Sequence, residues 1–271
     1  MINPVVITGA SGFVGQAILG ILEREGVPVT GVTRRSQPGL AIVADYADTP
    51  APEGAVLVHL AQRRHTSAPA DDSEIALCRV LAAKPWRHIV YASSAVVYGD
   101  EAVYPRRPEE QISADSDYAR AKLACEKIFS AAGGTNLRLA NLYGPGMGKN
   151  TVIADILRQI PGTGPLRLRD LTPVRDFLWI EDAARCLAAA CRVMPGGIFN
   201  AGSGSGMAIG KIARLALALA GEDTRPIIGE QTGNRASTLT LDISRTRSCL
   251  HWSPETDMES GIAALLSVVR Q

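Results

Sequence analysis

The sequence is poor in aromatic residues and has almost no excess charge of either sign. Phe, Trp and Tyr make up only 5% of its 271 residues, and 28 Lys and Arg against 27 Asp and Glu leave a formal net charge of +1. A surface that binds nucleic acid needs stacking and basic side chains, and one that binds an anionic membrane needs basic side chains. The composition therefore predicts neither nucleic acid nor a membrane as a partner.

Paired cysteines, metal-ligand spacings and long apolar runs are missing as well. The five Cys are odd in number and none stands in C-x-x-C spacing, so we expect small buried side chains in a reducing compartment. No cluster of His, Cys and Asp has metal-ligand spacing, and no metal is expected. The first residues form a strand pattern without a basic leader, and no apolar run is long enough to cross a bilayer. We therefore expect a cytoplasmic protein.

Hydrophobic residues make up 46% of the chain, which is enough for a full core. Short β-branched runs alternate with segments of helical period over the first half of the sequence. Continuous apolar runs, unlike strictly alternating ones, indicate strands buried on both faces. The sequence therefore predicts an α/β fold with a doubly wound parallel sheet. The expected strands are 5–7, 27–32, 41–44, 55–60, 88–93 and 137–142, and the expected helices are 13–24, 73–83 and 115–132.

The strand–helix rhythm changes after residue 146, where Gly and Pro become frequent. We predict a first domain over residues 1–146 and a small interleaved C-terminal lobe over residues 147–271. Residues from about 170 to 202 are expected to return to the main sheet. In this half we expect helices at 181–193, 207–220 and 256–269 and strands at 197–202 and 239–242.

Three glycines stand where the first expected strand passes into the first expected helix, two before the helix and one in its first turn. Gly9 permits a sharp turn, Gly12 lets backbone N–H groups approach a diphosphate, and Gly15 lets the helix pack closely on the sheet. The helix N-terminus adds unpaired N–H groups and a positive dipole end. This context predicts a dinucleotide site, the alternative being a glycine-rich turn without a ligand. The expected contacts come from Gly9, Ser11, Gly12, Phe13, Val14 and Gly15.

The spacing of this turn is G-x-x-G-x-x-G rather than the G-x-G-x-x-G of simple dehydrogenases. It resembles the extended short-chain dehydrogenase/reductase superfamily, in its nucleotide-sugar epimerase/dehydratase branch, and later motifs extend the resemblance over nearly the whole chain. The resemblance implies a Rossmann domain with a substrate lobe, a nicotinamide dinucleotide and a nucleotide-linked sugar. It also implies that Asp45 receives the adenine amino group and that Leu60 and Ala61 form the turn beneath the cofactor.

The end of the second expected strand bears on the choice between NAD and NADP. NAD-binding proteins of this type usually carry an acidic residue there, which holds the ribose diol. Here Arg34 and Arg35 follow the strand, and a guanidinium suits a 2′-phosphate or stacks on adenine. We therefore expect NADP to be preferred over NAD, with Arg34 as the contact. The alternative is that both arginines are solvated loop charges.

Tyr118 and Lys122 lie four residues apart on an expected helix and so share one face. A free phenol is a poor general base near neutrality, and an adjacent ammonium favours the phenolate. Tyr118 can then exchange a proton with a sugar oxygen while hydride moves at the same carbon, and Lys122 would also hold the nicotinamide ribose. Ser94 occupies the position that resembles the family's catalytic Ser or Thr, and its hydroxyl would donate to the substrate oxygen.

The two residues after Ser94 limit the reaction that the resemblance allows. Dehydratases of this branch carry an Asp-Glu pair where this chain has Ala95 and Val96, so dehydration is disfavoured. Epimerase–reductases that make fucose-type sugars carry Cys where Ala95 stands, so that chemistry is disfavoured too. We expect a keto-sugar reductase, with a 4-epimerase that retains tightly bound NAD as the alternative. A non-catalytic dinucleotide-sensing protein would predict damage to Ser94, Tyr118 or Lys122, and all three are present.

Residues in the second half of the chain point to a substrate with a diphosphate. The resemblance places Asn141 at this diphosphate and Arg175 and Arg235 near the nucleotide phosphates, which suits a group that needs two cations and an amide donor. They also argue against a non-sugar carbonyl as substrate. For Asp176 and Asn200 we favour structural hydrogen bonding over catalysis. The second and third expected helices carry surplus apolar residues and their counterparts in this family pair across a dimer, so we predict a homodimer.

Overall fold

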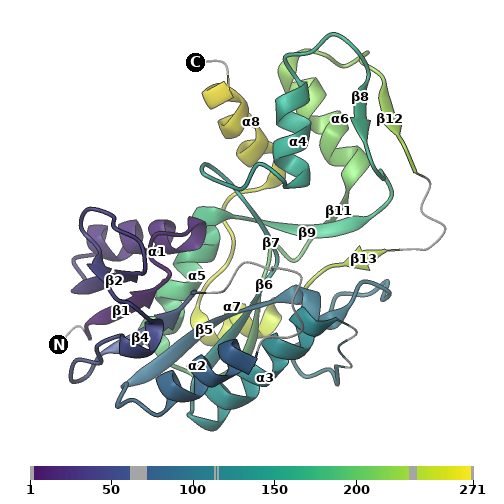
Figure 1. The fold of residues 1–271 in the computed structure, drawn as a ribbon. Coiled ribbons are helices and arrows are strands. Elements are labelled where there is room, and N and C mark those ends of the chain that lie inside the picture. The colour runs from purple at the N-terminus through teal and green to yellow at the C-terminus, as the bar shows by residue number, and fades with distance from the viewer. Residues whose placement is uncertain (1–2, 62–71, 113, 115, 232–236, 270–271) are drawn as a thin grey trace.

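The computed structural model describes residues 3–61, 72–112, 114, 116–231 and 237–269. These residues form a large α/β domain with a smaller lobe beside it (Figure 1). Within them, no helix is both long enough and apolar enough to span a membrane.

A seven-stranded sheet forms the centre of the large domain, and its strand pairs are all parallel. The predicted doubly wound Rossmann sheet is therefore confirmed. In spatial order the strands are β10 (Gly197–Ala201), β6 (Thr135–Leu139), β5 (His88–Ser94), β4 (Val56–His59), β1 (Val5–Thr8), β2 (Val29–Thr33) and β3 (Ala41–Ile42).

The order of the strands reverses at the centre of this sheet. The chain passes from β1 to β2 and β3 on one side, and it then crosses back to place β4 on the other side of β1. In doubly wound sheets, ligands bind outside the carboxyl ends of the strands at such a switch point. The glycine turn leaves β1 at this point, so the topology supports the predicted dinucleotide site.

Helices cover both faces of the sheet, which explains why the strands are continuously apolar. Val56 and Val58 of β4 face one core, whereas Leu57 between them faces another. Each core is closed by a pair of helices that pack against each other (Figure 1). The first pair is α1 (Phe13–Arg24) and α5 (Ile180–Val193), and the second is α2 (Asp72–Ala82) and α3 (Asp117–Ala131).

The single strand predicted over 137–142 is wrong. The structure divides this region into β6 and a separate strand, β7 (Asn141–Tyr143). Between them, the N–H of Ala140 donates to the carbonyl of Ala201 at 2.9 Å, and the chain then leaves the central sheet to pair with β9 (Val174–Trp179). An unbroken apolar pattern gives no sign that the chain changes sheets.

The smaller lobe has a core of its own, which includes Tyr143, Trp179 and Ile212. Of its short strands, the sequence predicts one, at 239–242, and the structure has β13 (Thr238–Leu239) there. Its other short strands and its first helix are not predicted, because segments of three to eight residues carry little periodic signal. Besides β7 and β9, the lobe contains β8 (Leu166–Leu168), β11 (Gly206–Ala208), β12 (Ile227–Gly229), β13 (Thr238–Leu239), α4 (Val152–Gln159), α6 (Ile209–Ala220) and α8 (Met258–Val269).

Three elements from the second half of the chain belong to the large domain. Helix α5 and strand β10 complete its layers, and α7 (Ser244–Leu250) packs against both. The lobe is thus interleaved with the large domain in the sequence. The boundary at residue 146 stays a prediction.

One ionisable ring is enclosed by the sheet. His59, the last residue of β4, has no exposed surface, and its Nδ1 lies 2.7 Å from Thr8 Oγ1. Burial, together with the charge of Lys122, lowers the pKa of His59 from its ordinary value to about 3. The ring is therefore neutral in the folded protein, as expected for a packed core histidine.

This burial predicts a pH dependence of stability. Below its ordinary pKa near 6.5, His59 takes up a proton in the unfolded chain but not in the folded one until the pH reaches about 3. The free energy of unfolding therefore falls as the pH falls through this window, by about 1.4 kcal/mol per unit. Urea titrations at pH 7 and about 4.5 should show a loss that is smaller in His59→Gln by roughly 2–3 kcal/mol. An equal loss in both proteins would contradict the assignment.

Candidate active site

The turn between β1 and α1 is built so tightly that two of its positions exclude any side chain. Gly9 has φ +74°, and a Cβ added there would lie 2.8 Å from the backbone nitrogen of Ala61. A Cβ added to Gly15 would lie 2.7 Å from Cα of Ala10 and would collide with the carbonyl oxygen of Gly9. Glycine is required at both positions because backbone, which cannot move aside, occupies the space.

The first turn of α1 is open to an anion. Its N-cap residue is Gly12, which has no side chain to accept the N–H groups that begin the helix. Those N–H groups, from Phe13, Val14 and Gly15, have no intrahelical partner and lie at the positive end of the helix. The turn is also tied to the end of β2, because the hydroxyls of Ser11 and Thr33 are 3.0 Å apart. This cradle fits the pyrophosphate of a dinucleotide.

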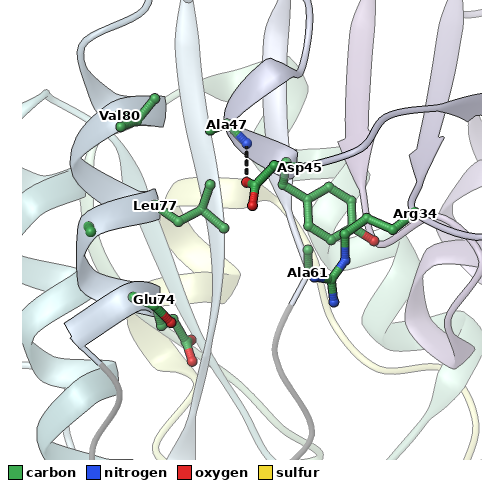
Figure 2. Close-up of a pocket in the computed structure, with 10 residues that line it drawn as sticks. Arg34, Asp45, Ala47, Ala61, Glu74, Leu77 and Val80 are labelled. Atoms are coloured by element: carbon green, nitrogen blue, oxygen red, sulfur yellow. Dashed lines mark hydrogen bonds between the residues drawn. The ribbon is translucent and has the colours of Figure 1, made fainter.

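A cavity of about 250 Å³ lies beside the end of β2, and Arg34, Asp45 and Ala61, which the sequence predicts as cofactor contacts, line it. Figure 2 shows Arg34, Asp45 and Ala61 on one side of it and Leu77 and Val80 of α2 on the other. These last two residues were missed in the sequence, although their spacing of three on an expected helix places them on one face. Helix α2 also contributes Glu74, so the cavity has apolar side chains and carboxylates around the guanidinium of Arg34.

The polar side chains of this cavity are held in place. The guanidinium of Arg34 lies 5.2 Å from the centre of the Tyr46 ring, a cation–π contact. Asp45 Oδ1 accepts a hydrogen bond of 2.8 Å from the N–H of Ala47, so one carboxylate oxygen caps the short helix at residues 46–48. Leu60 does not line this cavity, and its N–H donates to the carbonyl of Thr8 at 3.2 Å.

The three expected catalytic side chains come from the end of β5 and the start of α3. Ser94 ends β5, and its Oγ accepts a bond of 3.3 Å from the N–H of Val96. Tyr118 lies in the first turn of α3 and is half-buried. Lys122, one turn later, is only 4% exposed, and its Nζ donates to the carbonyl of Ala92 at 3.0 Å. This bond joins α3 to β5 two residues before Ser94.

A buried polar network lies behind these residues. Glu126 forms an ion pair with Arg138 at 2.7 Å, and both side chains are 3% exposed. Glu126 Oε1 also accepts the hydroxyl of Ser93, and Arg138 donates to the hydroxyl of Tyr98 at 2.9 Å. Tyr98 in turn donates to Asn200 at 2.7 Å, and burial raises its pKa to about 12. The network ties β5, α3, β6 and β10 together and is structural, as expected for Asn200.

The predicted phosphate contacts lie in different surroundings. Asn141 is exposed on β7, and its Nδ2 donates to the carbonyl of Asp176 at 3.2 Å. Arg175 on β9 lies 2.9 Å from the carboxylate of Asp100 and 2.6 Å from Ser237 Oγ. Arg175 therefore links the lobe to the loop after β5, a contact that no sequence pattern indicated. Arg235 lies outside the described residues.

Asp176 is buried and structural, as expected. Its carboxylate accepts N–H groups from Ser203, Gly204 and Leu241 at 2.7–3.2 Å. Elsewhere in the part of the chain that the structure describes, no group of three or more His, Cys, Asp and Glu could hold a metal ion.

Comparison with known proteins confirms the resemblance drawn from the sequence. The sequence model of the "NAD dependent epimerase/dehydratase family" matches residues 5–202. A dTDP-6-deoxy-L-talose 4-dehydrogenase (NAD(P)(+)) of Kitasatospora kifunensis is 25% identical over 96% of this chain and 94% of its own length. A UDP-glucose 4-epimerase of Corynebacterium glutamicum is 24% identical over 94% and 92%. The crystal structure of a UDP-N-acetylglucosamine 4-epimerase from Bacillus cereus superposes with a TM-score of 0.86 and 24% identity, over 99% of this chain and all of the other.

Two glycines of α1 give a matched test of the cradle. Gly15→Ala should abolish the rise in melting temperature that NADPH produces, because the added Cβ collides with the Gly9 carbonyl. Gly20→Ala is the control: its Cβ would meet only the flexible end of Arg24, and it should stabilise the free protein by about 0.5–1 kcal/mol through helix propensity. A Gly15→Ala protein that keeps the full NADPH-induced rise would contradict this view of the turn.

Proposed function

The chain belongs to the NAD-dependent epimerase/dehydratase family, whose members are enzymes, and on that basis we propose that it is an NADP-preferring reductase of a nucleotide-linked keto-sugar. The observation that carries the proposal is the joining of Lys122 to β5, which brings Ser94, Tyr118 and Lys122 to the sheet edge where the glycine turn also lies. Dinucleotide chemistry and proton transfer thereby share one edge of the sheet.

The three side chains have distinct roles in the proposed reaction. NADPH, when bound, would supply the hydride that reduces the sugar carbonyl carbon. Tyr118 gives its phenolic proton to the substrate carbonyl oxygen as that carbon is reduced, and solvent later restores the proton. The Ser94 hydroxyl donates a hydrogen bond to the same oxygen and stabilises its developing charge. The ammonium of Lys122 favours the phenolate of Tyr118 and binds the nicotinamide ribose.

Reduction suits this chain better than dehydration. Ala95 and Val96 follow Ser94, and neither side chain can exchange a proton, so elimination of water has no acid or base at these positions. The alternative is a 4-epimerase that keeps NAD bound and returns the hydride to the other face of a transient ketone. The similarity to a UDP-glucose 4-epimerase favours this alternative. A non-catalytic dinucleotide sensor is disfavoured because Ser94, Tyr118 and Lys122 are intact.

The lobe supplies groups for a diphosphate. We propose Asn141, Arg175 and Arg235 as its contacts. The guanidinium of Arg175 already bonds Asp100, so the diphosphate shares this cation with a carboxylate. A second cation, Arg235, is then needed to balance the charge of the substrate.

We also propose that the protein is a cytoplasmic homodimer. All five cysteines are free, which suits a reducing compartment. Helices α2 and α3 lie side by side. Solution scattering should give twice the mass of the chain, and a monomer would contradict the dimer.

A panel of nucleotide sugars and keto-sugars tests the reaction. Wild-type protein should consume added NADPH in proportion to a reduced sugar product. Tyr118→Phe should lower kcat by about 100-fold or more with little change in NADPH affinity, because proton transfer is lost and the ring remains. Isomerised product without cofactor consumption would favour the epimerase, and cofactor binding without turnover of any sugar would favour the sensor. Full activity in Tyr118→Phe would refute the mechanism.

The preference for NADP rests on Arg34, and a substitution tests it. Arg34→Ala should weaken NADPH binding by about 10- to 100-fold, the range for a charged hydrogen bond, and should change NADH binding little. Arg35→Ala is the control, since Arg35 is exposed and does not line the cavity. Fluorescence titration gives both dissociation constants. A similar loss for both cofactors in Arg34→Ala would remove Arg34 from the 2′-phosphate site.

A further inference from the structure

The buried ammonium of Lys122 contacts a backbone carbonyl and two aromatic rings. Its Nζ donates to the carbonyl of Ala92 at 3.0 Å and lies 4.7 Å from the centre of the Tyr91 ring. The same Nζ lies 5.9 Å from the centre of the Tyr118 ring. A cation removed from water needs compensation, and the face of an aromatic ring provides it without neutralising the charge.

The Tyr91 ring is rigidly packed. Tyr91 lies on β5 and is 1% exposed. Its ring stacks on that of His59, with centres 5.8 Å apart and planes 20° apart, and packs at 5.0 Å from Phe129. His59 is itself fixed by its contact with Thr8. Burial raises the pKa of Tyr91 well above its ordinary value, so the phenol stays neutral and offers its π face to the cation.

We propose that Tyr91 is a positioning residue for Lys122: its ring face holds the ammonium beside Tyr118, where it favours the phenolate and reaches the nicotinamide ribose. The proposal rests on the proposed function for the roles of Tyr118 and Lys122. The ring, and not the phenolic hydroxyl, does the positioning, because the ammonium lies over the ring centre. Carbonyl oxygen and ring together fix the ammonium from two directions, whereas the carbonyl alone leaves the flexible lysine chain free to turn.

A carboxylate in place of the ring would hold the ammonium more tightly but would cancel its charge. The structure provides a direct contrast within the same helix. Glu126, one turn after Lys122, neutralises Arg138 and builds the buried network. The Tyr91 ring attracts the Lys122 ammonium through its quadrupole and adds no negative charge of its own.

Substitutions at position 91 separate the ring from the hydroxyl. Tyr91→Leu should lower kcat/KM for the keto-sugar and weaken NADPH binding, each by roughly 10- to 30-fold, the ratio that corresponds to a desolvated cation–π contact. Tyr91→Phe should keep kcat/KM and NADPH affinity within about twofold of wild type, since the ring face remains. Leu81→Ala is the control for loss of core packing, because Leu81 is a fully buried aliphatic residue of the same cluster. It should lower the melting temperature without changing either value.

A second experiment keeps the test valid if Tyr91→Leu does not fold. It changes the electron density of the ring at position 91 and leaves its shape nearly unchanged. Incorporation of 3,4,5-trifluorophenylalanine at position 91 weakens the quadrupole and retains the packing, so both values should fall between those of Phe and Leu. NADPH affinity is measured without a sugar, so it tests the role of Tyr91 even if no sugar in the panel is reduced. A failure to reduce any sugar would count against the proposed function alone. The positioning role of Tyr91 is overturned if fluorination has no effect, if Tyr91→Phe behaves like Tyr91→Leu, or if Leu81→Ala shows the same losses.

Discussion

No side chain fits where the turn after β1 meets the end of β4. A Cβ on Gly9 would lie 2.8 Å from the Ala61 nitrogen, and one on Gly15 would press on the Gly9 carbonyl. This close approach fixes the start of α1 at the switch point, with its first N–H groups open. Because all strands of the sheet are parallel, the cavity beside Arg34 and the end of β5 lie along the same edge. Backbone packing thus determines where the glycine turn and the first turn of α1 lie, independently of the proposed catalytic side chains.

Two buried cations near this edge, Arg138 and Lys122, have different kinds of contacts. Arg138 forms an ion pair with Glu126 and a hydrogen bond to Tyr98, and these contacts hold four elements together. Lys122 contacts a carbonyl and ring faces, and its charge remains available to a neighbouring phenol. Breaking a buried pair of the first kind typically costs about 3–5 kcal/mol of stability. A cation of the second kind is expected to matter more for chemistry than for folding.

The sequence reveals what depends on local order and hides what depends on contacts between distant segments. The long helices and most of the buried strands carry periodic patterns, and the predicted doubly wound sheet is confirmed. The glycine turn lies between β1 and α1, where its spacing places it. The break at Ala140, by contrast, depends on Ala201, and the ion pair of Arg175 depends on Asp100, seventy-five positions away. Likewise, the spacing of Tyr118 and Lys122 indicates a shared face, but nothing in it points to Tyr91. The roles of these residues follow from tertiary packing that no local pattern encodes.

The most direct measurement follows the hydride itself. The protein is incubated with NADPH that carries deuterium at the transferable position of C4, together with the nucleotide keto-sugar panel, and the products are examined by mass spectrometry and NMR. We predict a reduced sugar that is one mass unit heavier than the product made with unlabelled NADPH, with the deuterium on the former carbonyl carbon. A reduced product without deuterium, or tight NADPH binding with no sugar product at all, would contradict hydride transfer to a sugar at this site.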